Sequence, residues 1–235
     1  MVPAPRVKIC CISDISEGRL AIEHGADALG LVSHMPSGPG VISDQWIARI
    51  AATVPPGVAS FLLTCLQSAD AIIDQQRKLK VNTIQLCDSL PHSEYALLRQ
   101  ALPGVKLVQV IHVTGENAIA EASQIDSFVD GILLDSGNPA LAVKELGGTG
   151  RRHDWTISRR IRDAVAAPVY LAGGLCAENV AEAMATVQPF GLDVCSGVRT
   201  DGQLDETKLA AFFEAVHAAV PSANLSPERM SERLS

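Results

Sequence analysis

The chain has 235 residues, of which 47% are hydrophobic and 19% charged, and its formal net charge is −7. This length suits one large domain, and the composition excludes a disordered chain. The acidic balance argues against a nucleic-acid partner, which requires a basic face. It does not exclude a small anionic ligand, because backbone N–H groups bind phosphate whatever the total charge. There is neither an apolar run of the ~18 residues that cross a bilayer nor a signal-peptide pattern at the start. We therefore expect no membrane partner and a cytoplasmic location.

Short apolar runs alternate with helix-like segments eight times along the chain. The runs are rich in Val, Ile and Leu and mostly apolar at successive positions, which is typical of strands covered on both faces. In chain order, the predicted strands are Val7–Ile12, Ala28–Ser33, Val58–Thr64, Thr83–Cys87, Lys106–Val113, Gly131–Asp135, Val169–Gly173 and Leu192–Ser196. The predicted helices that follow them are Asp14–His24, Ser43–Val54, Ser68–Lys80, Ser93–Leu102, Asn117–Ile125, Thr156–Ala166, Ala177–Val187 and Asp205–Val220.

The first two predicted helices carry start and stop signals. Asp14 and Ser43 are residue types that cap helix N-termini, because their side chains accept from free backbone N–H groups. Gly25 follows the first helix as a predicted C-cap, and Pro55 stops the second.

Strict alternation of strand and helix predicts parallel strands joined by right-handed crossovers. Eight such units in this length favour closure into a single-domain α/β fold, the (β/α)8 TIM barrel, over residues 1–220. An open doubly wound sheet is the alternative, but it usually has fewer strands. Residues 221–235 are polar, and we expect them to form a loose or weakly helical tail.

Two reactive residues end predicted strands, where barrels of this kind place their catalytic side chains. Cys10 ends the first strand and Asp135 the sixth. A carboxylate after four apolar residues is partly removed from water, which suits a general acid, and a cysteine that ionises near neutrality serves as base or nucleophile. A helix-capping aspartate and a small buried cysteine are the alternatives. The residues alone do not decide whether Asp135 is an acid or a helix cap. Nor do they decide whether Cys10 is reactive or simply buried.

Glycines follow the sixth, seventh and eighth strands. Gly148 lies in GGTG, Gly173 and Gly174 in LAGGL, and Ser196 and Gly197 in CSGV. Glycine lets backbone approach a ligand closely, helix N-termini bind anions, and the loops after strands seven and eight are a frequent phosphate site of barrels. Tight turns alone would also explain the glycines. Their occurrence at neighbouring strands favours a phosphate held by backbone N–H groups of Gly174, Gly197 or their neighbours.

Six cysteines occur without any C-x2-C pair, and a chain of this size needs no disulfides, so reduced thiols are the simplest interpretation. Several of them end strands or lie in adjoining loops. A thiol-rich metal or redox site is therefore a further alternative. Structural zinc normally takes four well-placed ligands, and these dispersed positions lack that spacing. The cysteines are Cys10, Cys11, Cys65, Cys87, Cys176 and Cys195.

An ordered set of motifs resembles the phosphoribosylanthranilate isomerase family of tryptophan biosynthesis. The motifs lie between Arg6 and Val220 and read VKICCIS, GADALGLV, ILLDS, GGTGRRHDW, YLAGGLCAENV and GLDVCSGV. The resemblance implies an aldose–ketose isomerase that carries out an Amadori rearrangement of N-(5-phosphoribosyl)anthranilate to carboxyphenylamino-deoxyribulose phosphate. It implies no metal and no organic cofactor.

The resemblance also implies roles for single residues. Cys10 corresponds to the general base and Asp135 to the general acid, and the phosphate loops correspond to Gly173, Gly174, Ser196 and Gly197. Asp135 would protonate the furanose ring oxygen and open the ring to a Schiff base. Cys10, as thiolate, would then remove the C2′ proton, and the resulting enolamine would tautomerise to the ketone.

The sequence departs from the family pattern at several positions. Cys11 stands where a glycine normally follows the catalytic cysteine, Cys87 where a histidine is usual, and Leu63 where an asparagine is usual. Arg199 stands where an acidic residue is common, and we expect its charge to lie near the phosphate. Gly40 stands where the family pattern has an arginine, and the resemblance implies that this arginine binds the anthranilate carboxylate.

The residue at position 40 bears on the substrate. Without the arginine, phosphoribosylanthranilate is expected to bind more weakly, with His34 of the same loop as a partial substitute when protonated, and Gly40→Arg is expected to lower KM. The alternative is a divergent barrel paralogue that acts on, or only binds, another sugar phosphate. In each case the partner is a small-molecule sugar phosphate, and the protein is expected to be a monomer or homodimer.

Overall fold

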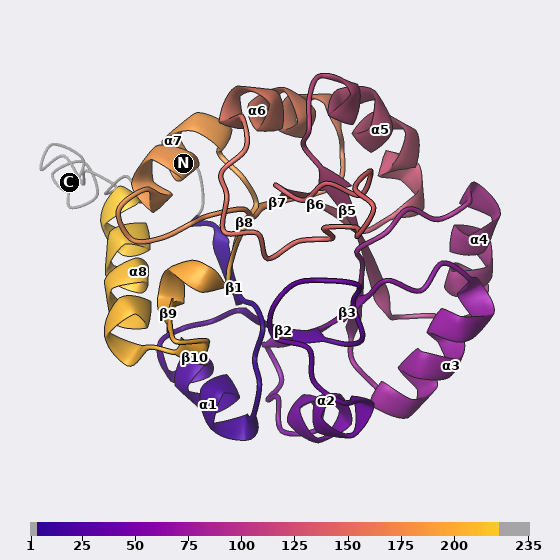
Figure 1. Cartoon of the computed structure of the whole chain (residues 1–235), viewed down its shortest axis with the longest axis horizontal. Coiled ribbons are helices and arrows are strands. Elements are labelled where there is room, and N and C mark those ends of the chain that lie inside the picture. Colours follow the sequence, from indigo (N-terminus) through magenta and orange to yellow (C-terminus); the bar gives the residue numbers. More distant parts are fainter. Residues whose placement is uncertain (1–3, 221–235) are drawn as a thin grey trace, which may run out of the picture.

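The computed structural model describes residues 4–220, and the predicted polar tail lies outside them. Eight parallel strands close into a barrel in sequence order, and eight helices surround it as an outer ring (Figure 1). The strands are β1 Arg6–Ile9, β2 Ala28–Val32, β3 Ala59–Thr64, β4 Thr83–Leu86, β5 Lys106–His112, β6 Gly131–Asp135, β7 Val169–Leu171 and β8 Gly191–Val194. The helices are α1 Ile15–Glu23, α2 Asp44–Ala51, α3 Ala69–Leu79, α4 His92–Ala101, α5 Asn117–Ile125, α6 Trp155–Ala164, α7 Val180–Val187 and α8 Glu206–Ala219. The predicted (β/α)8 barrel is confirmed.

Closure of the barrel depends on β1, which pairs with strands at both ends of the sequence. Lys8 lies opposite Ala28 of β2 on one side and opposite Asp193 of β8 on the other. All neighbouring pairs are parallel, so the carboxyl ends of the strands meet at one end of the barrel. Residues that follow the strands therefore gather there.

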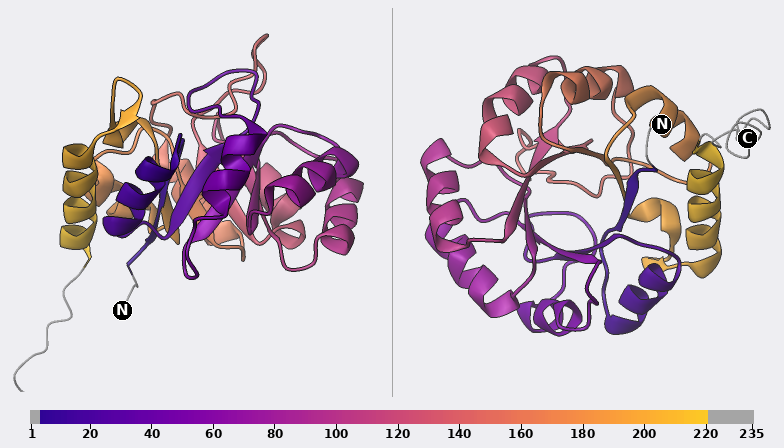
Figure 2. Two further views of the ribbon diagram at one scale, coloured as in Figure 1. Left: turned by 90° about the horizontal axis from the view of Figure 1, so that it is seen from below. Right: turned by 180° about the vertical axis from the view of Figure 1, so that it is seen from behind.

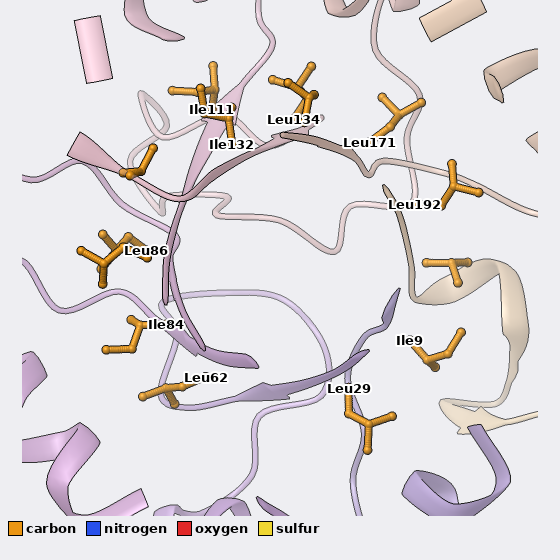
Figure 3. Packing of buried hydrophobic residues seen from close by; sticks show 14 of the residues in the cluster. Ile9, Leu29, Leu62, Ile84, Leu86, Ile111, Ile132, Leu134, Leu171 and Leu192 are labelled. Carbon is orange, nitrogen blue, oxygen red and sulfur yellow. The ribbon is translucent and has the colours of Figure 1, made fainter. Parts of the chain in front are cut away.

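Two apolar layers hold the barrel. Side chains of a strand alternate between its two faces, so each strand contributes to both layers. The inner layer fills the barrel and includes Phe61, Leu63, Val108 and Leu133. The outer layer packs between strands and helices, and Figure 3 shows its side chains pointing away from the barrel interior. Those labelled there are Ile9, Leu29, Leu62, Ile84, Leu86, Ile111, Ile132, Leu134, Leu171 and Leu192.

The predicted N-caps of the first two helices are confirmed, whereas α2 ends at Ala51, before the predicted stop at Pro55. Asp14 accepts from Glu17 N at 2.9 Å, Ser43 caps α2, and Gly25 has φ +102° after α1. The seventh helix is shorter than predicted and starts at Val180. Its predicted first turn is held apart from the helix as a loop, because the Asn179 side chain accepts from Cys176 N at 3.0 Å.

The chain after β8 takes a path that the sequence pattern did not predict. Ser196–Val198 forms one 3-10 turn, η2, in place of a strand end and a longer helix. A short antiparallel hairpin follows, with β9 Arg199–Thr200 and β10 Gln203–Leu204, and Figure 1 shows it between α1 and α8. Across residues 4–220, no helix has both the length and the apolar character needed to cross a membrane.

Candidate active site

A solvent-open cavity lies at the end of the barrel where the strands' carboxyl ends meet. Its wall combines thiols, two carboxylates, apolar side chains and many glycines. Within residues 4–220, no Lys, Arg or His side chain belongs to this lining. The lining residues are Cys10, Cys11, Val32, Met35, Ser37, Gly38, Pro39, Leu63, Gln85, Cys87, Asp135, Leu146, Gly147, Gly148, Thr149, Gly150, Ala172, Gly173, Gly174, Leu175, Asp193, Cys195 and Ser196.

Cys10 follows β1 and is buried at the floor of this cavity. Its backbone is fixed, because its N–H donates to Val194 O at 2.8 Å and its carbonyl accepts from Arg199 Nη2 at 3.1 Å. A methyl group placed on Gly30 would lie 2.9 Å from Cys10 Sγ and 3.1 Å from Lys8 Nζ. The thiol and the ammonium group therefore lie on the same inner side of the barrel.

Asp135 ends β6 and is buried in the same cavity. Its Oδ1 accepts from Ser136 N at 2.7 Å, and the Ser136 hydroxyl pairs with Thr149 Oγ1 at 2.7 Å. A Cβ on Gly147 would lie 2.6 Å from Oδ2, so only glycine leaves this oxygen uncovered. The carboxyl group is thus held by its neighbours on one side and faces the loop after β6 on the other.

An ion pair between Lys8 and Asp193 lies beneath Cys10, and sequence reasoning missed it. Lys8 Nζ is 2.8 Å from Asp193 Oδ1, and the two side chains are 0% and 8% exposed. Burial opposes the charge of Lys8, but the charges of Asp193 and Cys10 outweigh it and raise the pKa of Lys8. Burial raises the pKa of Asp193 although Lys8 opposes this. The sequence does contain a signal for its place: side chains alternate along a strand, so Lys8 and Cys10, on either side of Ile9, share one face of β1.

The loops after β6 and β7 meet through their glycines. Gly148, Gly173 and Gly174 all line the cavity and have φ values of +66°, +86° and +65°, which favour glycine. A Cβ on Gly174 would lie 2.9 Å from Gly150 O and 3.1 Å from Arg151 O. The backbones of the two loops are therefore in close contact at the mouth of the barrel.

The loop after β8 joins this arrangement through Ser196 and Gly197. Ser196 lines the cavity, whereas Gly197 lies behind the lining. A Cβ on Gly197 would overlap Leu175 O at 1.9 Å, so this glycine is required for the contact between the loops after β7 and β8. The structure thus brings four of the five residues predicted for the phosphate to the cavity surface and the fifth directly behind it.

Two loops cover part of the mouth, one after β2 and one after β6. Figure 2 shows both rising from the same end of the barrel. Ser37 Oγ donates to Lys144 O at 2.7 Å, and a Cβ on Gly148 would lie 2.6 Å from Pro39 Cδ. The two loops therefore support each other over the cavity.

Gly40 and Cys11 are in contact, so two of the departures from the family pattern are one structural feature. Cys11 has φ +62° and Gly40 has φ +79°. A Cβ on Gly40 would lie 2.4 Å from Cys11 Cβ and 2.8 Å from its Sγ. An arginine at residue 40 would overlap the Cys11 side chain, and the expected effect of Gly40→Arg on KM stays a prediction. His34 is not part of the cavity lining.

Arg199 does not reach the cavity, so its predicted place near the phosphate is wrong. It is buried, and its Nη1 is 2.8 Å from Glu17 Oε1. Its Nη2 donates to the carbonyls of Cys10 and Cys11 at 3.1 and 2.6 Å. Carbonyl and carboxylate acceptors on the outside of the barrel hold the guanidinium group, which orients the segment that carries Cys10.

The cysteines fall into two groups. Cys10, Cys11, Cys87 and Cys195 line the cavity, whereas Cys65 and Cys176 do not. Burial raises the pKa of the Cys87 thiol well above its ordinary range. Among the described residues, no three His, Cys, Asp or Glu side chains are placed to hold a metal ion.

A carboxyl group and a thiol on separate walls of one cavity provide the acid and the base that proton transfer between two carbon centres requires. The barrel and this cavity together fit an aldose–ketose isomerase.

Comparison with known proteins agrees with this class. Residues 7–215 match the family described as PRAI, N-(5'phosphoribosyl)anthranilate (PRA) isomerase. The N-(5'-phosphoribosyl)anthranilate isomerase of Methanocella arvoryzae is 35% identical over 88% of this chain and 95% of its own length. The crystal structure of the isomerase from Thermotoga maritima is 30% identical with a TM-score of 0.77, and covers 91% of this chain and 99% of its own. A phosphoribosyl anthranilate isomerase in complex with reduced 1-(o-carboxyphenylamino)-1-deoxyribulose 5-phosphate is 28% identical with a TM-score of 0.74. The match covers 91% of this chain and 99% of that structure's chain.

The chain belongs to the N-(5'-phosphoribosyl)anthranilate isomerase family. The reaction of this family is the conversion of N-(5'-phosphoribosyl)anthranilate to the aminoketose phosphate in tryptophan biosynthesis, and the expected aldose–ketose isomerase is confirmed.

Proposed function

We propose that the cavity at the carboxyl ends of the strands carries out this rearrangement, with Asp135 as general acid and Cys10 as general base. The observation that carries the proposal is their placement. Both residues line one cavity, from β6 and β1, and β7 and β8 separate these strands on the shorter way around the barrel. A sugar bound between them is therefore approached from two sides.

The first step belongs to Asp135. Its proton passes to the ring oxygen of the ribose, the bond between C1′ and that oxygen breaks, and the nitrogen lone pair completes a Schiff base. Ser136 N at 2.7 Å from Oδ1 fixes the carboxyl plane. Gly147, which has no side chain to cover Oδ2, leaves the other oxygen accessible.

The second step belongs to Cys10. Its thiolate removes the proton from C2′, the electrons neutralise the Schiff-base nitrogen, and the enolamine tautomerises to the ketone. The Lys8 ammonium lies on the same inner side of the barrel as this thiol. Lys8 touches no substrate in this scheme, so it acts as a positioning residue. No step requires a metal or an organic cofactor.

The phosphate group is proposed to bind where the loops after β6, β7 and β8 meet. Gly148, Gly173 and Gly174 provide backbone close to the cavity, Ser196 provides a hydroxyl, and Gly197 allows the loops to approach. Because the lining contains no cation within residues 4–220, binding depends on N–H and O–H donors. The relative solved with a phosphorylated ketose analogue supports a phosphosugar ligand. The number of subunits, a monomer or homodimer, stays a prediction.

Purified protein should isomerise N-(5'-phosphoribosyl)anthranilate, with product formation as the readout. Cys10→Ala and Asp135→Asn are each expected to lower kcat by about 10²–10⁴-fold, while calorimetry shows the reduced ketose analogue still bound. Cys176→Ser is the matched control, because that thiol lies outside the cavity lining. Unchanged kcat in either active-site variant would remove that residue from the mechanism. Absence of activity in the unmodified protein would point to another aminosugar phosphate.

A further inference from the structure

Cys11 and Cys195 come together at the mouth of the barrel although 184 positions separate them in sequence. Their Sγ atoms are 2.8 Å apart, and the Cys11 thiol donates in a second contact to Pro39 O at 3.7 Å. A disulfide has an S–S distance of about 2.03–2.05 Å. A movement of less than about 1 Å therefore separates these two thiols from a covalent bond.

The surrounding backbone places Cys11 at this point. The residue has φ +62°, which side chains rarely adopt, and Arg199 holds its carbonyl at 2.6 Å. Gly40 supplies the space, because any side chain there would overlap Cys11. The thiol is thus directed toward Cys195 by several independent contacts.

The two thiols differ in the ease with which they ionise. The hydrogen bond with Cys11 lowers the pKa of Cys195 although burial opposes this, and the charge of Arg199 adds to the lowering. Hydrogen bonds with Cys10 and Cys195, together with burial, raise the pKa of Cys11. Cys195, which is half-buried and lines the solvent-open cavity, is therefore the nucleophile of the pair.

We propose that Cys11 and Cys195 form a reversible disulfide that switches the isomerase off under oxidising conditions. The part of this inference that concerns activity rests on the proposed function. The oxidant is a low-molecular-weight disulfide that enters through the open cavity.

The exchange proceeds in two steps. The Cys195 thiolate attacks one sulfur of the reagent disulfide, forms a mixed disulfide and releases the first reagent thiolate. Cys11, after loss of its proton to water, attacks the Cys195 sulfur and releases the second. The protein loses two electrons in forming one S–S bond, and the reagent gains them as two thiols.

Cys10 and Ser196 are the sequence neighbours of the two cysteines that this disulfide would join. It would tie the loop after β1 to the loop after β8 and remove the proton that Cys11 shares with Cys195. A misplacement of about 1 Å at a reacting group can lower the rate by about 10²-fold. We therefore expect the oxidised protein to retain less than about one tenth of the activity of the reduced protein.

The test treats the full chain with oxidised glutathione, alkylates free thiols and digests with trypsin. Cleavage at Lys and Arg gives the peptides 9–19 and 163–199, which contain Cys11 and Cys195. Fragment spectra are expected to show these peptides joined through Cys11 and Cys195. Isomerase activity of the same samples should fall with cross-link formation and return with dithiothreitol.

Three variants make the result specific, each compared with its own reduced state. Cys11→Ser and Cys195→Ser should lose the cross-link and the reversible inactivation. Cys176→Ser should keep both, although Cys176 lies on the same tryptic peptide as Cys195. A cross-link through Cys10 or Cys176, or reversible inactivation that persists in Cys195→Ser, would overturn the inference. Activity of the reduced protein tests the proposed function separately.

Discussion

The contact between residues 40 and 11 predicts how Gly40→Ala affects stability. A Cβ at residue 40 would lie 2.4 Å from the Cβ of Cys11, and the backbone there has φ +79°. A side chain in left-handed backbone costs about 1–2 kcal/mol, and an added methyl group in a packed site costs typically about 1–3 kcal/mol. Gly40→Ala is therefore expected to lower the free energy of unfolding by about 2–5 kcal/mol.

Two comparisons separate these contributions. Gly104 has φ +88° with no atom within 4 Å of its missing Cβ, so Gly104→Ala measures backbone strain alone, about 1–2 kcal/mol. Cys11→Gly removes the side chain that the new methyl group would meet. In that background the Cα of residue 11 still lies 3.0 Å from the new Cβ. Gly40→Ala should therefore cost less than in the unmodified protein, with a coupling energy of up to about 1–3 kcal/mol between residues 11 and 40.

Urea unfolding of the four proteins of this double-mutant cycle, and of Gly104→Ala, provides the measurement. Effects that add within about 0.5 kcal/mol would refute the contact. So would a cost of Gly40→Ala no larger than that of Gly104→Ala.

The same contact changes the test of substrate recognition. An arginine at residue 40 carries the same Cβ, so Gly40→Arg should be introduced together with Cys11→Gly. Because a hydrogen bond to a charged group contributes about 1.5–3 kcal/mol, the double variant is expected to have a KM roughly 10–100-fold below that of Cys11→Gly alone. An equal KM in the two variants would show that residue 40 does not face the anthranilate carboxylate.

Three further outcomes are expected from buried or closely packed groups. Lys8→Met leaves the Asp193 charge without its partner and should lower the free energy of unfolding by about 3–5 kcal/mol. The double variant Lys8→Met with Asp193→Leu should recover most of this loss. Thermal unfolding that shows no recovery in the double variant would contradict the role of the ion pair. Burial lowers the pKa of His153 from 6.5 to about 4, although Asp135 and Asp154 oppose it. As pH decreases, the unfolded chain therefore binds a proton at His153 before the folded protein does, and stability should fall from about pH 6.5 to about pH 4. In His153→Phe the urea midpoint should change less over this range. An equal change of the midpoint in the two proteins would contradict this role of His153. Gly197→Ala should raise KM for the phosphosugar through its overlap with Leu175 O, and Gly202→Ala, which has no atom within 4 Å of its missing Cβ, should not.

Periodicity and turn residues predicted most of the fold. The bounds of β6 and α5 agree with the predicted segments, because Asp135 ends one apolar run and Asn117 begins a clear helical pattern. The strands β7 and β8 end two residues earlier than predicted. There the chain leaves the sheet at Ala172 and Cys195, and apolar character alone does not mark the last ladder hydrogen bond.

The site was predicted less completely than the fold. Cys10 and Asp135 follow from their places at strand ends, which the barrel topology brings to one cavity. The contact between Cys11 and Gly40 depends on the path of the loop after β2, which no local pattern encodes. Arg199 was placed wrongly because its charge suggested a ligand, whereas in the structure it faces acceptors outside the cavity.

The two backbone hydrogen bonds of Cys10 also determine when this proposed general base becomes oriented during biosynthesis. The N–H of this residue donates to Val194, and its carbonyl accepts from Arg199, so both partners are synthesised long after Cys10. A nascent chain emerges amino end first, and its first strand lacks these two contacts until β8 and the hairpin after it have left the ribosome. A product truncated before β8 would contain the cysteine without the backbone contacts that orient it. Activity should therefore appear only after β8 and this hairpin have been synthesised and have met the first strand at Cys10.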